Sequence, residues 1–397
     1  MAKGIPSGWN AAAHALWLRA EKGPAIQAVL ASINANGDKK PLPLVLQLAY
    51  YLYLIGDFKS AAGFLERVRP DYPRNAELLL NLGVLTSRSG AHEKSVAYMK
   101  ELIEIDPNNA VAFDSLASSC SRLGAFDEAR DAGTRALVLK DAACARIAKA
   151  GTFPAQGPAA WLAGQGKADV VSFSLWGADP RYLRGAVDNA LQIAEVYPGW
   201  RARFYVDESV PGEIREVLDG LGAHVVLERP GQALRERLTW RFKVANDPGV
   251  GRFLVRDVDA VVNHREAWAV AQWIASDRWF HVMRDWWTHT DLMLAGMWGG
   301  VAGVLPDLAR SLKNYTPATV ETPHIDQIFL RDRVWPLIRG QCLVHDRYFS
   351  PPGAVKWDLP EPAGNTHVGQ DVFAARRTEQ AARLEPWVNC YASLGPA

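Results

Sequence analysis

The sequence is poor in cysteine, has no marked excess of charge of one sign and contains no long apolar run. Its four cysteines are scattered and form no C-x-x-C pair, which excludes a disulfide framework and is typical of buried thiols in a reducing compartment. A formal net charge of +1 argues against nucleic acid or an acidic membrane as the main partner. No apolar run reaches the ~18 residues of a membrane span. Residues 1–6 lack the apolar core of a signal peptide, so we expect a cytoplasmic protein.

What the sequence does contain is an internal repeat in its first half. The 397 residues are enough for two or three domains at roughly 100–200 residues each. Equivalent residues recur every 34 positions, in the sets Gly56, Gly90 and Gly124; Leu48, Leu82 and Leu116; and Ala61, Ser95 and Ala129. Pro73 and Pro107 close the first two units, and Asp141 stands where a third proline would. A 34-residue period of helix, glycine turn and helix resembles the tetratricopeptide repeat.

The repeats predict an α-helical solenoid domain over residues 1–150. Two amphipathic segments, 9–20 and 24–35, favour a further helix pair that caps the stack, because each unit of a solenoid buries its apolar face on its neighbour. Residues 151–167 are rich in glycine and proline and are interpreted as a linker. The remaining residues, 168–397, follow a different pattern, so we expect a second domain there.

The second half of the chain alternates short apolar runs rich in β-forming residues with helical patterns. Strands are predicted over 170–175, 202–206, 224–227, 253–255, 279–283, 297–304 and 342–344. Helices are predicted over 180–196, 212–221, 234–245, 305–314 and 324–339. Such alternation predicts a mostly parallel sheet with helices on its faces.

The most informative motif is a pair of carboxylates, Asp257 and Asp259, that follows the apolar run 253–255. In an extended strand, side chains two residues apart project from the same face, so both carboxylates are expected to converge on one cation. The carboxyl end of a core strand is also where α/β sheets bind ligands. Taken alone, a D-x-D pattern is more often a solvated turn or a cap than a pair of metal ligands, and its place at the end of a core strand is what favours the metal site.

Further motifs follow one another along residues 168–375. They are 171–177, 203–209, 240–242, 256–259, 265–266, 280–285, 289, 296–299 and 326–327. The ordered set resembles an A-type nucleotide-sugar glycosyltransferase domain of a bacterial family. The resemblance implies a Rossmann-like α/β fold after the repeats, a nucleoside diphosphate sugar as donor and Mn²⁺ or Mg²⁺ as cofactor. The sequence departs from the family pattern at Ala260, where serine is usual, and at 285–289, where Asp-Trp-Trp-Thr-His replaces Asp-His-Pro-x-His.

The nucleotide is expected at the carboxyl end of the first predicted strand. Ser174, Trp176 and Gly177 lie there, where backbone and small side chains can hold a base, and a plain strand exit is an equal alternative. Arg241 and Arg256 are candidates for charge-assisted hydrogen bonds to the diphosphate. Arg256 can equally pair with a neighbouring carboxylate.

The metal is expected between Asp257, Asp259 and the diphosphate. Carboxylates suit Mn²⁺ or Mg²⁺ and leave coordination positions for diphosphate oxygens. Related enzymes use a late histidine as third ligand, and His345 and His367 are the two candidates, with His345 favoured because it follows a strand. Neither reproduces the histidine-glycine-lysine-proline-tryptophan signature of glycogenin-like enzymes. A lone histidine is more often structural than a metal ligand.

Three residues are candidates for the reaction itself. Asp285 ends an alternating strand pattern and is a candidate for binding a sugar hydroxyl or acting as a base. Asp326 and Gln327 begin a helical segment, where an acidic residue also serves as a cap or complements the helix dipole. Their resemblance to the Asp-Gln pair that contacts the donor sugar in retaining galactosyltransferases and glycogenin-like enzymes favours a role in the reaction. Trp286 and Trp287 are expected to stack on the acceptor.

These observations predict a metal-dependent glycosyltransferase that moves a hexosyl unit from a nucleoside diphosphate sugar to a hydroxyl. The repeats are expected to present a peptide or protein acceptor, because repeat stacks form concave grooves. A small glycan or lipid-linked acceptor is the alternative within this class. A second hypothesis is a catalytically inactive sugar-nucleotide-binding scaffold whose repeats bind a partner protein. A metal-dependent phosphohydrolase would explain the acidic pair but not the repeats.

Overall fold

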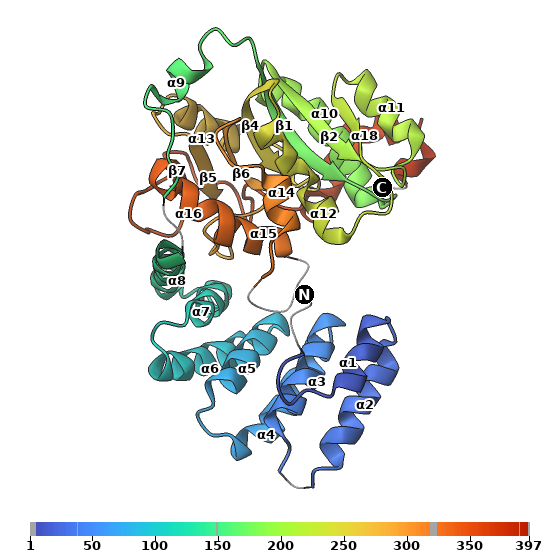
Figure 1. Ribbon diagram of the computed structural model, residues 1–397, viewed down its shortest axis with the longest axis vertical. Coiled ribbons are helices and arrows are strands. Elements are labelled where there is room, and N and C mark those ends of the chain that lie inside the picture. The colour runs from blue at the N-terminus through green and yellow to red at the C-terminus, as the bar shows by residue number, and fades with distance from the viewer. Residues whose placement is uncertain (1–4, 38, 148–149, 318–323, 389, 396–397) are drawn as a thin grey trace. The chain divides into compact units, whose positions relative to one another are not determined.

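The computed structural model describes residues 5–37, 39–147, 150–317, 324–388 and 390–395. The chain divides into two compact units, Met1–Lys140 and Asp141–Ala397 (Figure 1). The division falls inside helix α8 (Phe126–Ile147), so that its last turns, from Asp141 on, belong to the second unit and bond to other residues of that unit. Asp141 accepts a hydrogen bond from the Trp335 indole at 2.7 Å, and the Cys144 thiol donates to the Arg331 carbonyl at 3.4 Å. The expected boundary after residue 150 lies beyond these contacts.

The first unit is a stack of helix pairs. Its helices are α1 (Ala11–Leu18), α2 (Lys22–Asn34), α3 (Leu42–Leu54), α4 (Phe58–Val68), α5 (Ala76–Arg88), α6 (His92–Ile105), α7 (Ala110–Arg122) and the first part of α8, with the 3₁₀ turn η1 (Arg69–Asp71) after α4. Gly56, Gly90 and Gly124 connect the helices of three pairs at φ of +82°, +85° and +77°, a conformation that favours glycine. The prediction of tetratricopeptide-type repeats is therefore confirmed.

The predicted capping pair also forms. Helices α1 and α2 pack on α3 through a core that contains Ala13, Val29, Ile33, Leu48 and Tyr51. Among the described residues of the chain, no helix is long and apolar enough to cross a membrane.

The second unit is built on a mixed sheet of eight strands. They are β1 (Ala168–Leu175), β2 (Trp200–Val206), β3 (His224–Leu227), β4 (Val250–Arg256), β5 (Phe280–Arg284), β6 (Met297–Val301), β7 (Cys342–Asp346) and β8 (Ala354–Val355). Their order across the sheet is β3-β2-β1-β4-β6-β5-β7-β8, and the described pairings are parallel except those that β6 makes with β4 and β5. The mostly parallel α/β unit expected from the sequence is thus present.

Helices flank this sheet (Figure 1). They are α9 (Gly157–Leu162), α10 (Pro180–Val196), α11 (Gly212–Gly220), α12 (Leu234–Thr239), α13 (His264–Ile274), α14 (Leu308–Lys313), α15 (Ile325–Phe329), α16 (Trp335–Ile338), α17 (Val372–Ala375) and α18 (Arg377–Val388). Four short helical segments join them: the 3₁₀ helices η2 (Trp240–Asn246), η4 (Arg339–Gln341) and η5 (Ala392–Leu394), and the π-helical η3 (Leu330–Val334). Helix α9 lies in the segment 151–167 that was expected as a linker, and Phe153 and Trp161 of this segment pack on Trp279 beside β5.

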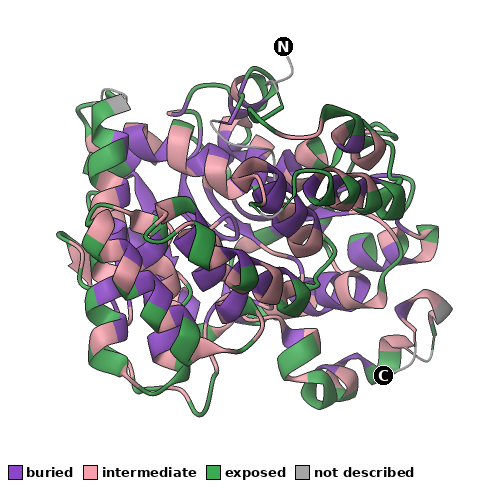
Figure 2. Ribbon diagram, turned by 90° about the horizontal axis from the view of Figure 1, so that it is seen from below, coloured by how far each residue is buried: buried purple, intermediate pink, exposed green. Residues whose placement is uncertain are grey.

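The two faces of the sheet are covered by different elements. Most residues of β1 and β4 are buried, and buried strands appear purple in Figure 2. The hydroxyl groups of Ser172 and Ser174 bond to the backbone of Arg241 in η2, so η2 covers the face to which these two serines point. Arg256 points to the opposite face, where it bonds to Glu266 of α13. Because side chains alternate along a strand, this division decides which predicted site residues can meet.

Candidate active site at the carboxyl ends of β1 and β4

The carboxyl ends of β1 and β4 meet where the strand order reverses. Strand β1 lies between β2 and β4, and all three run parallel. The region outside such a reversal is where open α/β sheets bind ligands. Trp176 and Gly177 directly follow β1 and are partly exposed, and the Gly177 N–H donates to the Ser209 hydroxyl at 2.7 Å. The Ser174 hydroxyl accepts from Arg241 N at 3.0 Å, so its contact fixes η2 against β1.

Arg241, which is buried, joins two of the predicted carboxylates, the buried Asp326 and the partly exposed Asp257. Its Nη1 pairs with Asp257 Oδ1, and its Nη2 lies 3.2 Å from Asp326 Oδ2. Nη1 also donates to the carbonyl of Arg256 at 3.1 Å, which ties the guanidinium to the end of β4. Burial raises the pKa of the Asp326 carboxyl, while the charge of Arg241 opposes that shift. Sequence positions 241, 257 and 326 are therefore brought together as expected of a shared site.

The two carboxylates of the D-x-D motif do not point the same way. Strand β4 ends at Arg256, and the Ala260 N–H donates to the Asp257 carbonyl at 3.2 Å, so Asp257 to Asp259 form a turn. The expectation of an extended pair does not hold for this turn, because the two-residue alternation stops where the strand stops. Asp257 turns toward Arg241, whereas Asp259 turns toward Arg181 at the start of α10.

Arg181 forms a second bridge beside the first. Its Nη2 lies 2.5 Å from Asp259 Oδ2 and 3.0 Å from Asp371 Oδ2. Asp371 comes from the C-terminal segment, which is held there by an antiparallel bridge to Ala260. Burial, followed by the negative charge of Asp257, raises the pKa of the Asp259 carboxyl, and Arg181 opposes this shift. The two Asp-Arg-Asp bridges are thus electrostatically coupled neighbours.

The charges of this region suit a hard divalent cation. Four carboxylates and two guanidinium groups carry a formal charge of −2, and the Asp257 side chain is 45% exposed. An ion held by one or two carboxylates, with other positions left for substrate oxygens and water, fits this donor set. A site with three protein ligands does not fit: in the described part of the chain no group of three histidine, cysteine, aspartate or glutamate residues is arranged to hold a metal.

Three predicted site residues lie on the opposite face of the sheet. Arg256 is one residue from Asp257 and, by strand alternation, points away from it, with Nε 3.0 Å from Glu266 Oε1. Two roles were considered for Arg256, a bond to phosphate and a pairing with a carboxylate. In the structure Arg256 pairs with the carboxylate of Glu266 and points away from the region expected to hold the nucleotide. Asp285 and His345 belong to the same face, since Asp285 pairs with Arg265 of α13 and His345 bonds to Gln272 of the same helix.

Asp285 is enclosed by structural partners. It is fully buried, its Oδ1 and Oδ2 lie 3.1 Å from Arg265 nitrogens, and Oδ2 also accepts from Val368 N at 2.8 Å. Burial raises the pKa of this carboxyl, and Arg265 opposes the shift. A base or sugar ligand must reach the substrate, and both Asp285 oxygens are already engaged in protein contacts. The structure therefore assigns Asp285 to holding the C-terminal segment rather than to the predicted chemistry.

His345 is also separated from the D-x-D turn. Its Nδ1 lies 2.9 Å from His281 Nε2, its Nε2 lies 3.2 Å from Gln272 Oε1, and it is fully buried. Burial lowers the pKa of His345 to about 4, and it also lowers the pKa of His281 well below its ordinary value. The other candidate, His367, stacks on Trp286 at 4.4 Å between ring centroids. The structure brings neither histidine to the pair of aspartates as a third metal ligand.

Gln327 lies next to the Arg241 cluster but faces a different partner. Its backbone N–H donates to Asp326 Oδ1 at 2.9 Å, and its Nε2 donates to Asp291 Oδ2 at 2.7 Å. Residue 327 is partly exposed. The segment 318–323, which precedes this helix, lies outside the described residues.

The tryptophans of the 285–289 segment pack against the protein. Trp287 is 7% exposed and stacks on Tyr348 with ring centroids 3.8 Å apart. His289 accepts from Asp285 N at 3.0 Å, and burial lowers its pKa to about 3. Trp287 is therefore placed as a packing residue, whereas Trp286 is a partly exposed residue whose ring stacks on His367.

Three residues of the site were not predicted. Arg181 and Asp371 carry the second bridge, and Gly296, just before β6, lies against Asp257. A Cβ atom at position 296 would come within 2.1 Å of Asp257 Oδ2 and 2.8 Å of Asp257 N. Gly296 belongs to the motif 296–299 of the sequence analysis, but only the antiparallel pairing of β6 with β4 shows why no side chain fits at this position.

Comparisons with known proteins concern short parts of the chain. No family model matches the sequence. A stretch of 62 residues is 37% identical to the Protein CTR9 homolog of Arabidopsis thaliana, and it spans 16% of this chain and 6% of that protein. Among solved structures, MamA from Desulfovibrio magneticus RS-1 (residues 41 to the end) is 18% identical with a TM-score of 0.30, over 33% of this chain and 72% of that one. YrrB, described as a TPR protein with an unusual peptide-binding site, is 16% identical with a TM-score of 0.30, over 32% and 65%.

Proposed function

We propose that the sheet unit transfers a hexosyl group from a nucleoside diphosphate sugar to a hydroxyl with the help of Mn²⁺ or Mg²⁺. The observation that carries this proposal is the Asp257–Arg241–Asp326 cluster at the reversal of strand order, beside the exposed end of β1. The cluster combines the partly exposed carboxylate of Asp257, the buried guanidinium of Arg241 and the buried carboxylate of Asp326. The ordered motifs of residues 168–375, which resemble A-type glycosyltransferases, support the same activity.

Each part of the cluster has a task in this reaction. Trp176 and Gly177 contact the nucleotide base at the end of β1, and Arg241 supplies positive charge beneath the diphosphate. Asp257, with Asp259 as a second ligand, would hold the cation, and a bound ion would stabilise negative charge on the departing diphosphate. Asp326 holds the Arg241 guanidinium and, with Gln327, faces the sugar.

The acceptor in this proposal is a peptide or protein bound by the repeat unit. Stacks of helix pairs expose a continuous groove, and the unit Met1–Lys140 contains such a stack. The reaction takes place in the cytoplasm.

A second function is favoured by two observations. Both carboxylates of the D-x-D motif are paired with arginines, and Asp285 is buried. This arrangement also suits a scaffold that binds a sugar nucleotide without turning it over. The two functions differ in a single measurable property, because a scaffold binds nucleotide but neither transfers nor hydrolyses the sugar.

The test is a panel of nucleoside diphosphate sugars incubated with the full-length protein and Mn²⁺ and scored for release of nucleoside diphosphate. Release from one donor, lost in Asp257→Asn, supports the transferase. Nucleotide binding in calorimetry with no release from any donor, with and without candidate peptides, would replace the transferase with the scaffold.

A further inference from the structure

Arg181 lies between two carboxylates at the edge of the candidate site. Its guanidinium contacts Asp259 at 2.5 Å and Asp371 at 3.0 Å, and its side chain is 37% exposed. A single positive group thus holds Asp259 in the direction opposite to Asp257. The Arg181 Nε is buried and has no hydrogen-bond partner among the described residues, so the carboxylates account for the anchoring of this side chain.

Arg241 provides an internal comparison. Its side chain is 6% exposed, and it bonds to two carboxylates and to the carbonyl of Arg256. Moving it would leave buried groups without partners, which is costly. Arg181 is more exposed: its polar contacts are the two ion pairs, its guanidinium lies 5.1 Å from the centre of the Tyr182 ring, and partly exposed ion pairs contribute about 0–1 kcal/mol. Of the two arginines, Arg181 is the one that can exchange its partner.

The C-terminal segment does not depend on Arg181 alone. The Val372 N–H donates to the Asp259 carbonyl at 3.0 Å, and Asp371 forms a backbone bridge with Ala260. These contacts involve backbone atoms and leave the Asp259 carboxylate out. The carboxylate can therefore turn toward Asp257 while Asp371 and its segment stay in place.

We infer that Arg181 is an internal competitor of the divalent cation at Asp259. When the ion binds Asp257 and Asp259, Arg181 gives up Asp259 and keeps Asp371. The inference rests on the proposed metal-dependent function and names a device that sets the metal affinity of that site. The cation and the Arg181 guanidinium compete for the Asp259 carboxylate. The apparent affinity of the protein for the cation is therefore reduced by the fraction of molecules in which Arg181 occupies Asp259.

The test is Mn²⁺ binding by the full-length protein, measured from the signal of free Mn²⁺ in electron paramagnetic resonance during titration without nucleotide. Arg181→Gln removes the charge and retains much of the side chain, and Arg181→Ala removes both. Arg383→Gln is the matched control, because Arg383 pairs with Asp188 at 3.0 Å and is 32% exposed in the same unit. Thermal melting of each variant checks the fold.

We expect both Arg181 variants to bind Mn²⁺ more tightly, by on the order of tenfold, since a competing positive charge has been removed. Arg383→Gln should bind like the wild type. Equal or weaker binding in folded Arg181 variants, with measurable binding in the wild type, would overturn the competitor role and leave the proposed function standing. Absence of Mn²⁺ binding in the wild type and in every variant, both with and without nucleoside diphosphate, would instead remove the metal site itself.

Discussion

Arg241 Nη2 lies 3.2 Å from Asp326 Oδ2, although the two residues are 85 positions apart in the chain. The same guanidinium holds Asp257 at the end of β4. A buried arginine between two carboxylates is costly to disrupt, because removal of one partner leaves a charge without compensation. This relationship links the D-x-D turn to helix α15 and makes them one site.

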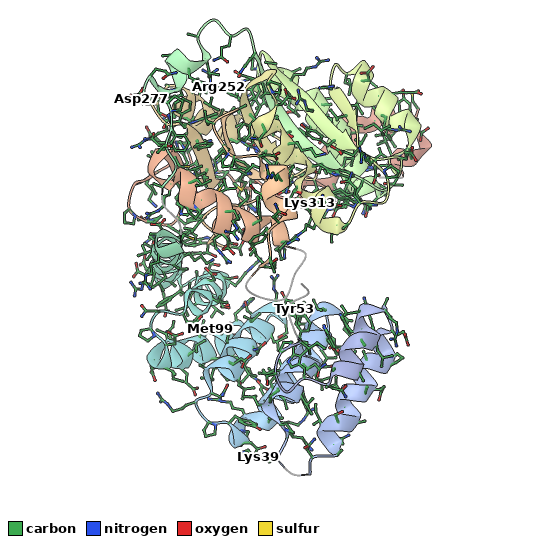
Figure 3. All side chains as sticks on the ribbon, in the orientation of Figure 1. Lys39, Tyr53, Met99, Arg252, Asp277 and Lys313 are labelled. Carbon is green, nitrogen blue, oxygen red and sulfur yellow. The ribbon has the colours of Figure 1, made fainter. Side chains whose placement is uncertain are left out.

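The first prediction concerns the acidic turn. Asp257→Asn and Asp259→Asn should each lower donor turnover on the order of 100-fold or more, because each removes a negative charge that we propose as a ligand of the cation. Release of nucleoside diphosphate at saturating donor and Mn²⁺ measures the effect. Asp169→Asn is the matched control. Asp169 lies near the amino end of β1 and pairs at 3.1 Å with Arg252 of β4, which is labelled in Figure 3. Near-wild-type turnover in Asp257→Asn would remove the turn from the active site.

The second prediction separates the sugar from the diphosphate. Asp326→Asn and Gln327→Ala should lower kcat about 10-fold to 100-fold, because these residues are proposed to face the sugar. The Kd of free nucleoside diphosphate, measured by calorimetry, should change much less. A large loss of nucleotide affinity with unchanged kcat would place the pair at the diphosphate instead.

The third prediction tests the close approach of β6 to the site. Gly296→Ala should lower turnover, and it should lower the free energy of unfolding by about 1–3 kcal/mol. Both effects are expected because the new methyl group collides with Asp257. Gly220→Ala is the control, since a Cβ at the exposed end of α11 meets no atom within 4 Å. Urea unfolding and the donor assay are the measurements. Wild-type behaviour of Gly296→Ala would show that the Asp257 carboxylate tolerates displacement.

The fourth prediction is a loss of stability in acid from the buried histidines. The folded protein holds His345 neutral, with a pKa lowered by burial to about 4, whereas an unfolded chain protonates histidine near 6.5. The unfolded state therefore binds more protons below pH 6.5, and stability falls as the pH drops from about 6.5 toward 4. His345 alone contributes about 3 kcal/mol to this loss, as an order of magnitude.

Urea unfolding at pH 7.5, 6 and 5 measures this dependence. His345→Gln should be less stable at pH 7.5 but lose less stability between pH 7.5 and 5 than the wild type does. His264→Gln changes an exposed histidine and should keep the wild-type slope. A His345→Gln slope equal to that of the wild type would mean that this histidine does not govern the acid response.

The fifth prediction concerns the division between the units. A fragment 141–397 should fold and bind Mn²⁺ and nucleotide, because it holds every residue of the candidate site. A fragment 161–397 should be less stable by about 1–2 kcal/mol or more, because it lacks Phe153, whose ring packs on Trp279 and Phe280, and Asp141. Thermal melting compares the two. Equal melting temperatures would show that residues 141–160 do not support the sheet unit.

The same fragments test the role of the repeats. Transfer to a peptide acceptor should fall sharply in both fragments, since the repeats would supply the binding energy that positions the hydroxyl. Donor hydrolysis by water should persist. Equal acceptor KM and kcat in the full chain and in 141–397 would show that the repeats do not recruit the acceptor.

The elements of this protein could be predicted from local patterns. Gly56, Gly90 and Gly124 mark turns that need positive φ, and the spacing of such positions is visible in the sequence. The runs before Ser174 and Asp257 are continuous stretches of β-forming residues and become β1 and β4. Alternation along β4 also determines the direction of the Arg256 side chain. From the sequence alone, two partners were open for Arg256, a phosphate and a carboxylate.

The sequence by itself thus determined the repeats, most strands and the place of the acidic turn, because helix, strand and turn preferences depend on residues within a few positions. Only the tertiary structure decided which charges meet. It paired Arg241 with Asp326, Arg181 with Asp371, and His345 with His281, across 64 to 190 positions in the chain. It also placed Asp285 and His345 on the face of the sheet opposite Asp257. Such partners are selected by strand order and by which face a side chain occupies, and neither property is encoded in any local stretch of residues.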